Sequence, residues 1–285
     1  MNTLGESIGG VIACAASREV EMKPGDYLDN AGIIICGKCN EPKQFIMQDF
    51  CGSKQNRLLP CMCRCEEAEY VRKQKELEEK LRLAQIKSLC VNGIQDSGIR
   101  SYRFETAEDS IYIQKCRKYV EQWDELFEAN MGLIFCGPPE CGKSFAAGCI
   151  ANALTDRGIP VLVTSFPRIL ESKYDKTELI TQMHRYDLVI IDDFGTERQS
   201  EYALETVYFT LDERYKSKKP LILTTNLGLA DLQNPVNIEY ERIYTRILEM
   251  CTPMVFKENR RRAKKAAEKL KRIKEIMADI TNTEA

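Results

Sequence analysis

The chain has 285 residues, of which 44% are hydrophobic and 29% are charged, a balance that excludes wholesale disorder and suits one large domain or two. It has no apolar run of about 18 residues and no basic start before an apolar segment, so neither a transmembrane helix nor a secretory signal is expected. The net charge is −2, but residues 257–275 hold ten Lys and Arg against three Glu, so the chain carries a strongly basic segment that could contact a polyanion.

The N-terminal third is predicted to contain three segments. Residues 1–30 show little pattern and are expected to form a flexible lead-in, whereas residues 31–66 concentrate the cysteines. A helical linker is expected over residues 67–99, because residues 66–90 are rich in Glu, Lys, Arg, Gln and Leu and lack Gly and Pro. Paired turn residues predict a break over residues 91–98.

From about residue 100 the sequence alternates between helical and strand patterns. The predicted helices cover residues 111–130, 144–157, 201–216 and 239–250. The predicted strands cover residues 131–136, 161–164, 188–191, 221–225 and 254–256. This alternation indicates βα units, so the fold class is α/β with a parallel sheet, in a domain over residues 100–262. A long basic helix is expected over residues 257–280, and the part of the chain at residues 263–285 is expected to form a basic C-terminal segment.

The sharpest motif is a phosphate-binding loop between the first of these strands and the next helix. It reads Gly137-Pro138-Pro139-Glu140-Cys141-Gly142-Lys143-Ser144 and fits G-x-x-x-x-G-K-[ST] at every fixed position. Such a loop cradles phosphate with its backbone N–H groups and the following helix N-terminus. Lys143 is expected to reach the β- and γ-phosphates of ATP, Ser144 to ligate Mg²⁺, and Phe145 to lie beside them. The flanking strand and helix disfavour the alternative of an ordinary Gly-rich turn.

Polar residues also follow two other predicted strands, where active sites of open α/β sheets lie. Asp192 is expected to hold the Mg²⁺ shell, and Asp193 to orient or deprotonate the attacking water. Asn226 could touch the γ-phosphate or that water. The alternatives are a solvated acidic turn and an asparagine that caps a turn.

Five arginines are candidates for a charge that stabilises phosphoryl transfer. Arg242 and Arg246 share one helix face, and residues 260–262 are all arginine. If Arg246 faces outward, it would serve the nucleotide of a neighbouring protomer. The alternative is that all five are solvated surface charges.

The order of these elements resembles the AAA+ P-loop ATPases, and more narrowly the DnaC/DnaI-type replicative helicase loaders and their IstB-type transposition relatives. The resemblance covers about residues 100–262 and is carried by the segments at residues 137–144, 157–170, 188–195, 221–227 and 242–250. It implies a five-stranded parallel sheet in the order 5-1-4-3-2.

The resemblance also implies roles for single residues. Asn226 would be the sensor 1 residue, Arg246 the arginine finger, and one of residues 260–262, Arg261 in our assignment, the sensor 2 arginine. Two departures from the wider AAA+ pattern are Asp193, where most members have Glu, and the absence of room for a helical lid. Both departures fit the loader group, although the shorter side chain of Asp193 leaves the rate of ATP hydrolysis open.

The cysteines at residues 36–65 predict a zinc-binding module. The odd total of 13 cysteines without a signal peptide favours a reducing compartment and metal ligands over disulfides. Cys36 and Cys39 form a C-x-x-C pair, and we take Cys63 and Cys65 as the second pair of a tetrahedral Zn²⁺ site. Cys51 and Cys61 are alternate ligands for this site. An Fe–S cluster in place of zinc is less favoured, and the remaining alternative is that these cysteines are free thiols that only pack.

These features predict a cytoplasmic ATPase of a bacterium or its phage that binds ATP, Mg²⁺ and Zn²⁺ and helps load a replicative DNA helicase onto single-stranded DNA. An arginine supplied in trans implies self-association or a partner ATPase, and no membrane contact is expected. The rival functions are an IstB-type transposition helper, an ATP-dependent binding switch with little turnover, and a small-molecule P-loop kinase. The kinase would need a lid and an acceptor pocket, and the sequence indicates neither.

Overall fold

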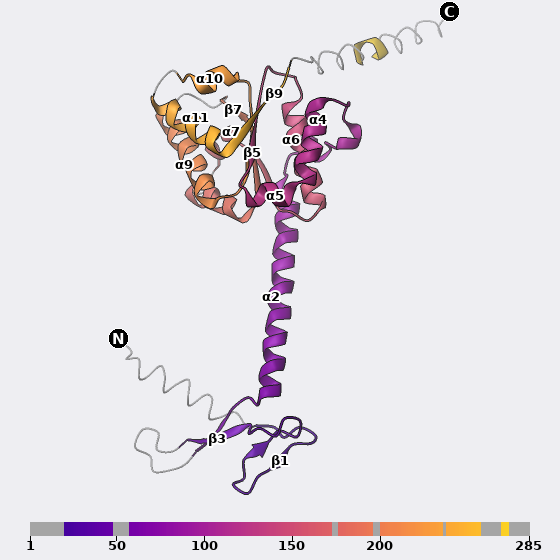
Figure 1. The fold of residues 1–285 in the computed structure, drawn as a ribbon, viewed down its shortest axis with the longest axis vertical. Helices are drawn as coiled ribbons and strands as arrows, with labels where there is room; N and C mark the ends of the chain where they lie inside the picture. Colours follow the sequence, from indigo (N-terminus) through magenta and orange to yellow (C-terminus); the bar gives the residue numbers. More distant parts are fainter. Residues whose placement is uncertain are drawn as a thin grey trace, which may run out of the picture. The chain divides into compact units, whose positions relative to one another are not determined.

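The computed structural model describes residues 20–47, 57–172, 176–195, 200–235, 238–257 and 269–273 (Figure 1). It divides the chain into two compact units, Met1–Leu83 and Ala84–Ala285. The finer segment boundaries expected from the sequence stay predictions. No helix within the described ranges is long and apolar enough to cross a membrane.

The first unit is built from two short antiparallel hairpins. Strand β1 (Tyr27–Leu28) pairs with β2 (Ile34–Ile35), and β3 (Gln44–Met47) pairs with β4 (Arg57–Pro60). Among its described residues, few apolar side chains are buried: Ile34, Cys36, Leu59 and Cys63. A core of this size supplies little hydrophobic stabilisation, so the unit needs further links between its segments.

Helix α2 (Arg64–Gly93) begins in the first unit and ends in the second. Most of its side chains are exposed, and Glu–Lys and Glu–Arg pairs one turn apart support it, such as Glu69 with Lys73 at 2.8 Å. The helix extends into the break expected at residues 91–98. It ends where Gly93 packs so closely on the Val161 carbonyl that a Cβ atom would overlap the oxygen.

The second unit contains the expected five-stranded parallel sheet. Its strands are β5 (Gly132–Cys136), β6 (Val161–Ser165), β7 (Leu188–Phe194), β8 (Leu221–Thr225) and β9 (Cys251–Val255). They lie in the order β6-β7-β8-β5-β9, and every neighbouring pair is parallel. Numbered along the chain, this is the order 5-1-4-3-2, so the predicted fold class and strand order are confirmed.

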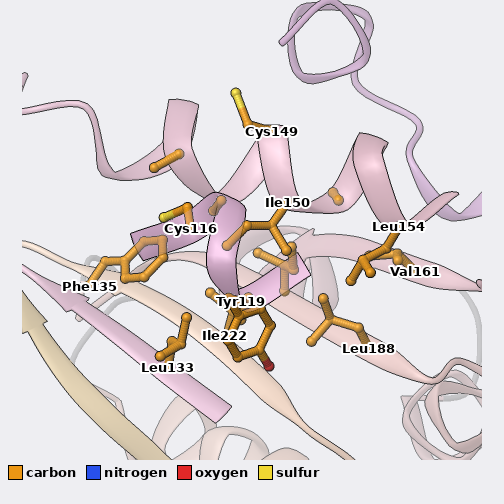
Figure 2. Close-up of a cluster of buried hydrophobic side chains, with 14 of the residues drawn as sticks. Cys116, Tyr119, Leu133, Phe135, Cys149, Ile150, Leu154, Val161, Leu188 and Ile222 are labelled. Atoms are coloured by element: carbon orange, nitrogen blue, oxygen red, sulfur yellow. The ribbon is translucent and has the colours of Figure 1, made fainter. Parts of the chain in front are cut away.

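Helices cover both faces of this sheet (Figure 1). Helices α4 (Ile111–Glu121) and α6 (Lys143–Asp156) pack on one face, and α9 (Glu201–Ser217) and α11 (Ile238–Met250) on the other. Alternate strand residues serve the two faces, since Phe135 lies in the first core and Ile134 in the second. Figure 2 shows the first core, where burial raises the pKa of the Cys116 and Cys149 thiols to about 12.

The remaining helical segments are short and connect these layers. They are α3 (Ser97–Arg100), η1 (Phe104–Thr106), α5 (Trp123–Glu128), α7 (Phe166–Leu170), α8 (Lys176–Gln182), η2 (Met183–Arg185) and α10 (Leu229–Gln233).

Three predicted elements differ from the structure. The helix expected over residues 111–130 is broken at Gln122, whose backbone leaves helical geometry, and buried Trp123 begins α5. The last strand begins at Cys251 rather than at residue 254, because the Cys251 side chain is buried and its backbone pairs with Gly132. Of the basic helix expected over residues 257–280, the structure describes residues 269–273, which are helical; most of the rest lies outside the described residues.

Arg214 ties α9 to the sheet from inside. Its side chain is 2% exposed, and its guanidinium donates to the carbonyls of Asp187 at 2.7 Å, Tyr186 at 3.0 Å and Pro220 at 3.1 Å. These carbonyls precede β7 and β8, so one buried cation fixes the starts of two neighbouring strands. Burial lowers the pKa of Arg214 to about 9, and the carbonyl partners offset part of this loss of solvation.

Candidate nucleotide and metal sites

The phosphate loop joins β5 to α6 in the conformation that its glycines predict. Gly137 has a φ of 146° and Gly142 a φ of 97°, and Glu140 between them is also left-handed at 66°. A Cβ atom at Gly137 would overlap the carbonyl oxygen of Phe256. Gly142 is the N-cap of α6, so the loop backbone lies at the N-terminus of a 14-residue helix, where the dipole favours an anion.

Lys143 connects this loop to the end of β8. Its Nζ donates to the carbonyls of Gly137 and Pro138, both at 2.8 Å, and to Asn226 Oδ1 at 3.0 Å. The side chain is 4% exposed. Two residues that are 83 positions apart in the sequence, and that were both predicted for the site, therefore meet through a direct hydrogen bond.

The acidic end of β7 has an unusual backbone. The strand runs through both aspartates to Phe194, and its register with β8 shifts between Ile191 and Phe194. Asp193 has a φ of 55°, which is uncommon for a residue with a Cβ atom. Such bulges redirect side chains next to active sites.

Thr224 of β8 holds this end in place. Its Oγ1 donates to Asp192 Oδ1 at 2.5 Å and accepts from the Asp193 N–H at 2.9 Å, and the residue is fully buried. This residue was not predicted from the sequence. The available signal was a pair of threonines inside an otherwise apolar buried strand, which must find hydrogen-bond partners there.

These elements surround a pocket of about 530 Å³. Of the residues predicted for the site, it is lined by Pro139, Glu140, Gly142, Lys143, Ser144, Phe145, Asp192, Asp193 and Asn226. Gly137, Pro138 and Cys141 belong to the loop but not to the lining. The Ser144 hydroxyl and the Asp192 carboxylate are oxygen donors of the kind that Mg²⁺ prefers, so the residues present fit that ion.

One wall of the pocket was not predicted. It comes from the segment between α2 and α4 and consists of Asp96, Ile99, Tyr102, Thr106 and Glu108. The Tyr102 ring packs on Phe145 with ring centroids 5.0 Å apart. The small residues of α6 were a usable sequence signal that another segment packs closely against this helix. In the structure that segment carries Tyr102, and a Cβ atom at Gly148 would lie 2.6 Å from its ring.

The predicted arginines lie away from this pocket or outside the described residues. Arg246 is not among the lining residues; it forms an ion pair with Asp212 of α9. Arg242 is exposed one turn earlier on α11. Residues 260–262, including the predicted Arg261, lie outside the described residues.

In the first unit, the four predicted thiols gather. The sulfurs of Cys36, Cys39, Cys63 and Cys65 all lie within 4.8 Å of one another, with Cys36–Cys65 and Cys63–Cys65 both at 3.4 Å. Zn–S bonds of about 2.3 Å space tetrahedral sulfurs about 3.8 Å apart, so this donor set fits Zn²⁺. Cys61 points elsewhere and donates to the Pro42 carbonyl, and Cys51 lies outside the described residues.

A buried ion-pair network links the two cysteine pairs. Lys43 Nζ lies 2.6 Å from Asp26 and 3.1 Å from Glu66, which directly follows Cys65. Asp26 also accepts from the Gly37 N–H inside the first pair, at 3.1 Å. The hydrogen bond from Lys43 lowers the pKa of Asp26 to about 2, and N–H donors from Cys39 and Lys38 lower that of Cys36 to about 6, which favours its thiolate form.

Comparison with known proteins decides the family. The sequence model of the IstB-like ATP binding protein family matches residues 56–269. The chain belongs to this family. Its match spans most of the chain and includes the whole phosphate loop, the acidic end of β7 and Asn226.

Individual relatives of this IstB-like protein are more distant. It is 29% identical to the replicative helicase loader DnaC of Escherichia coli K12 over 147 residues, which is 48% of this chain and 58% of DnaC. It is 27% identical to the phage-like element PBSX protein XkdC of Bacillus subtilis over 179 residues, which is 58% of this chain and 65% of XkdC. The chain thus spans less than two thirds of the length of these relatives. Among solved structures, DnaI matches the fold with a TM-score of 0.50 at 19% identity, covering 57% of this chain and 95% of DnaI.

Proposed function

We propose that this IstB-like protein is an ATPase that delivers a replicative DNA helicase to single-stranded DNA in the bacterial cytoplasm. The observation that carries the proposal is the pocket in which the phosphate loop, the β7 carboxylates and Asn226 meet. The likeness to DnaC, which is named as a replicative helicase loader, supplies the choice of partner.

ATP would bind with its phosphates at the N-terminus of α6. The loop N–H groups and the Lys143 ammonium would hold the β- and γ-phosphates, for which Lys143 exchanges its carbonyl partners at Gly137 and Pro138 for phosphate oxygens. Tyr102 and Phe145 would offer the base an aromatic wall. Ser144 and Asp192 would hold Mg²⁺, which neutralises phosphate charge when bound.

Hydrolysis would need a positioned water and a cation on the transferring phosphoryl group. Asp193 would orient the water and accept its proton, and Asn226 would hydrogen-bond the water or the γ-phosphate. Arg246 does not line its own pocket, so a second copy of the chain or a partner ATPase would supply this arginine in trans. Assembly on DNA would then be coupled to turnover.

The first unit would supply the contact to helicase or DNA once Zn²⁺ is bound by Cys36, Cys39, Cys63 and Cys65. Zinc would stabilise a unit that has a small core. This module favours helicase delivery over the rival role of an IstB-type transposition helper.

A closed single-stranded DNA circle tests the delivery directly, because a ring-shaped helicase cannot thread onto it from an end. The zinc-loaded protein with ATP should increase the helicase retained on the circle and its displacement of an annealed oligonucleotide. Lys143→Ala should abolish this increase in retained helicase. The control Lys115→Ala, at an exposed lysine of α4, should leave it intact. No increase with wild-type protein and its cognate helicase would contradict the proposal.

A binding switch with little turnover is the second candidate, and the short Asp193 side chain favours it. It predicts helicase retention that needs ATP binding but proceeds equally with a non-hydrolysable ATP analogue.

A further inference from the structure

Arg246 is held in a cage made by one face of α9. Tyr208, Asp212 and Tyr215 are spaced four and three residues apart, so their side chains project from the same side of the helix. The Arg246 guanidinium lies 4.6 Å from the centre of the Tyr215 ring and 5.7 Å from that of Tyr208. Its Nη1 donates to Asp212 Oδ1. A carboxylate and two aromatic rings thus fix one cation.

This arrangement restricts a side chain that is otherwise flexible. Arginine has many rotamers, and each ordered contact removes part of the freedom that would be lost on binding a phosphate. The Arg246 side chain is still 25% exposed, so the cage leaves part of it accessible to solvent. Asp212 is anchored in turn by Lys216 Nζ at 2.8 Å, and this second cation helps to keep the pKa of the carboxyl below its usual range.

We propose that Asp212 and Tyr215 are positioning residues that pre-organise Arg246 for the nucleotide of a second copy of this chain. The inference rests on the proposed function, because it requires an arginine supplied in trans. Asp212 fixes the direction of the guanidinium through a charge-assisted hydrogen bond, and Tyr215 fixes its plane by stacking. Neither residue lines the pocket of its own chain. Both act through Arg246.

A complementation assay between two full-length, zinc-loaded variants isolates the arginine that is supplied in trans. The acceptor, Arg246→Ala, keeps its own pocket but offers no arginine. The donor, Lys143→Ala, offers Arg246 but cannot turn over ATP itself. Phosphate release by the mixture on single-stranded DNA, above that of either variant alone, therefore measures how well the donor presents its arginine.

The donor is then changed at the cage. Donors that also carry Asp212→Asn or Tyr215→Leu should restore about five- to tenfold less phosphate release than the Lys143→Ala donor. The matched changes Asp212→Glu and Tyr215→Phe retain a carboxylate or a ring and should restore most of it. Because the acceptor's pocket and its ATP affinity are untouched, a loss cannot come from altered ATP binding. Thermal unfolding of each donor identifies any variant that fails to fold. If an Asp212 variant fails to fold, the comparison of Tyr215→Leu with Tyr215→Phe decides the outcome.

The outcomes separate the two claims. If the Lys143→Ala donor itself gives no complementation, the trans arginine and the inference built on it are both overturned. If that donor works and the folded Asp212→Asn and Tyr215→Leu donors work equally well, the proposed function stands and the positioning role is refuted. A higher release with Asp212→Asn would also refute it, since it would mean that the cage withholds the arginine.

Discussion

Removing the Thr224 hydroxyl should damage the site although Thr224 does not line the pocket. Thr224→Val conserves the side-chain shape but deletes the donor to Asp192 and the acceptor for the Asp193 N–H. A hydrogen bond to a charged group contributes roughly 1.5–3 kcal/mol, and an N–H left without a partner costs about 1 kcal/mol or more. The second unit should therefore lose about 2.5–4 kcal/mol of its free energy of unfolding.

The same change should also weaken the proposed Mg²⁺ site. Groups that orient a metal ligand typically account for 10- to 100-fold in affinity or activity, so the half-saturating Mg²⁺ concentration for ATP turnover should rise about tenfold. Urea unfolding followed by circular dichroism measures the stability, and a Mg²⁺ titration of phosphate release measures the site.

Thr224→Ser is the matched control, because it keeps the hydroxyl and deletes only a methyl group, at a cost of about 1 kcal/mol. It should have a nearly unchanged Mg²⁺ requirement. Equal Mg²⁺ requirements in the Val and Ser variants would refute the reasoning that Thr224 orients Asp192.

Three further predictions concern other parts of the chain. Cys63→Ser should abolish stoichiometric Zn²⁺ binding, and Cys61→Ser should retain it, as measured by elemental analysis after dialysis; equal zinc content would contradict the ligand set. Arg214→Met should lower the free energy of unfolding by about 3 kcal/mol or more, because it strands buried carbonyls; a loss below about 1 kcal/mol in urea titration would show that the network is not needed. Tyr102→Ala should weaken ATP binding by about fivefold in calorimetry while Tyr102→Phe retains it, and equal affinities would remove Tyr102 from the base wall.

The layout of the sheet could be predicted from the sequence because its signals are local. Short apolar runs such as residues 131–136 and 221–225 alternate with helical patterns, and the phosphate loop marks the strand next to α6. The four thiols that gather in the first unit were also the predicted set, because paired cysteine spacing on both sides indicates a metal site. Spacing alone left Cys51 and Cys61 open as alternates, and the family resemblance favoured the last pair.

What was missed depends on contacts between distant residues. Thr224 contacts the aspartates because β8 pairs with β7 in a register that places this residue opposite the bulge. The residues around position 224 do not indicate that register. The pocket wall around Tyr102 comes from a segment with short helical turns and no long apolar period. The ion pair of Arg246 with Asp212 joins two helices whose packing is set by the whole second core, so the sequence left Arg246 open as a surface charge.

The proposed function requires that the pocket at Lys143 hydrolyses ATP in an assembled protein. Phosphate release from Mg·ATP by the zinc-loaded full-length chain, with and without single-stranded DNA, tests it most directly alongside Lys143→Ala and Arg246→Ala. We expect turnover that DNA stimulates and that both substitutions abolish. Wild-type protein that binds ATP but releases no more phosphate than Lys143→Ala, with or without DNA, would contradict it.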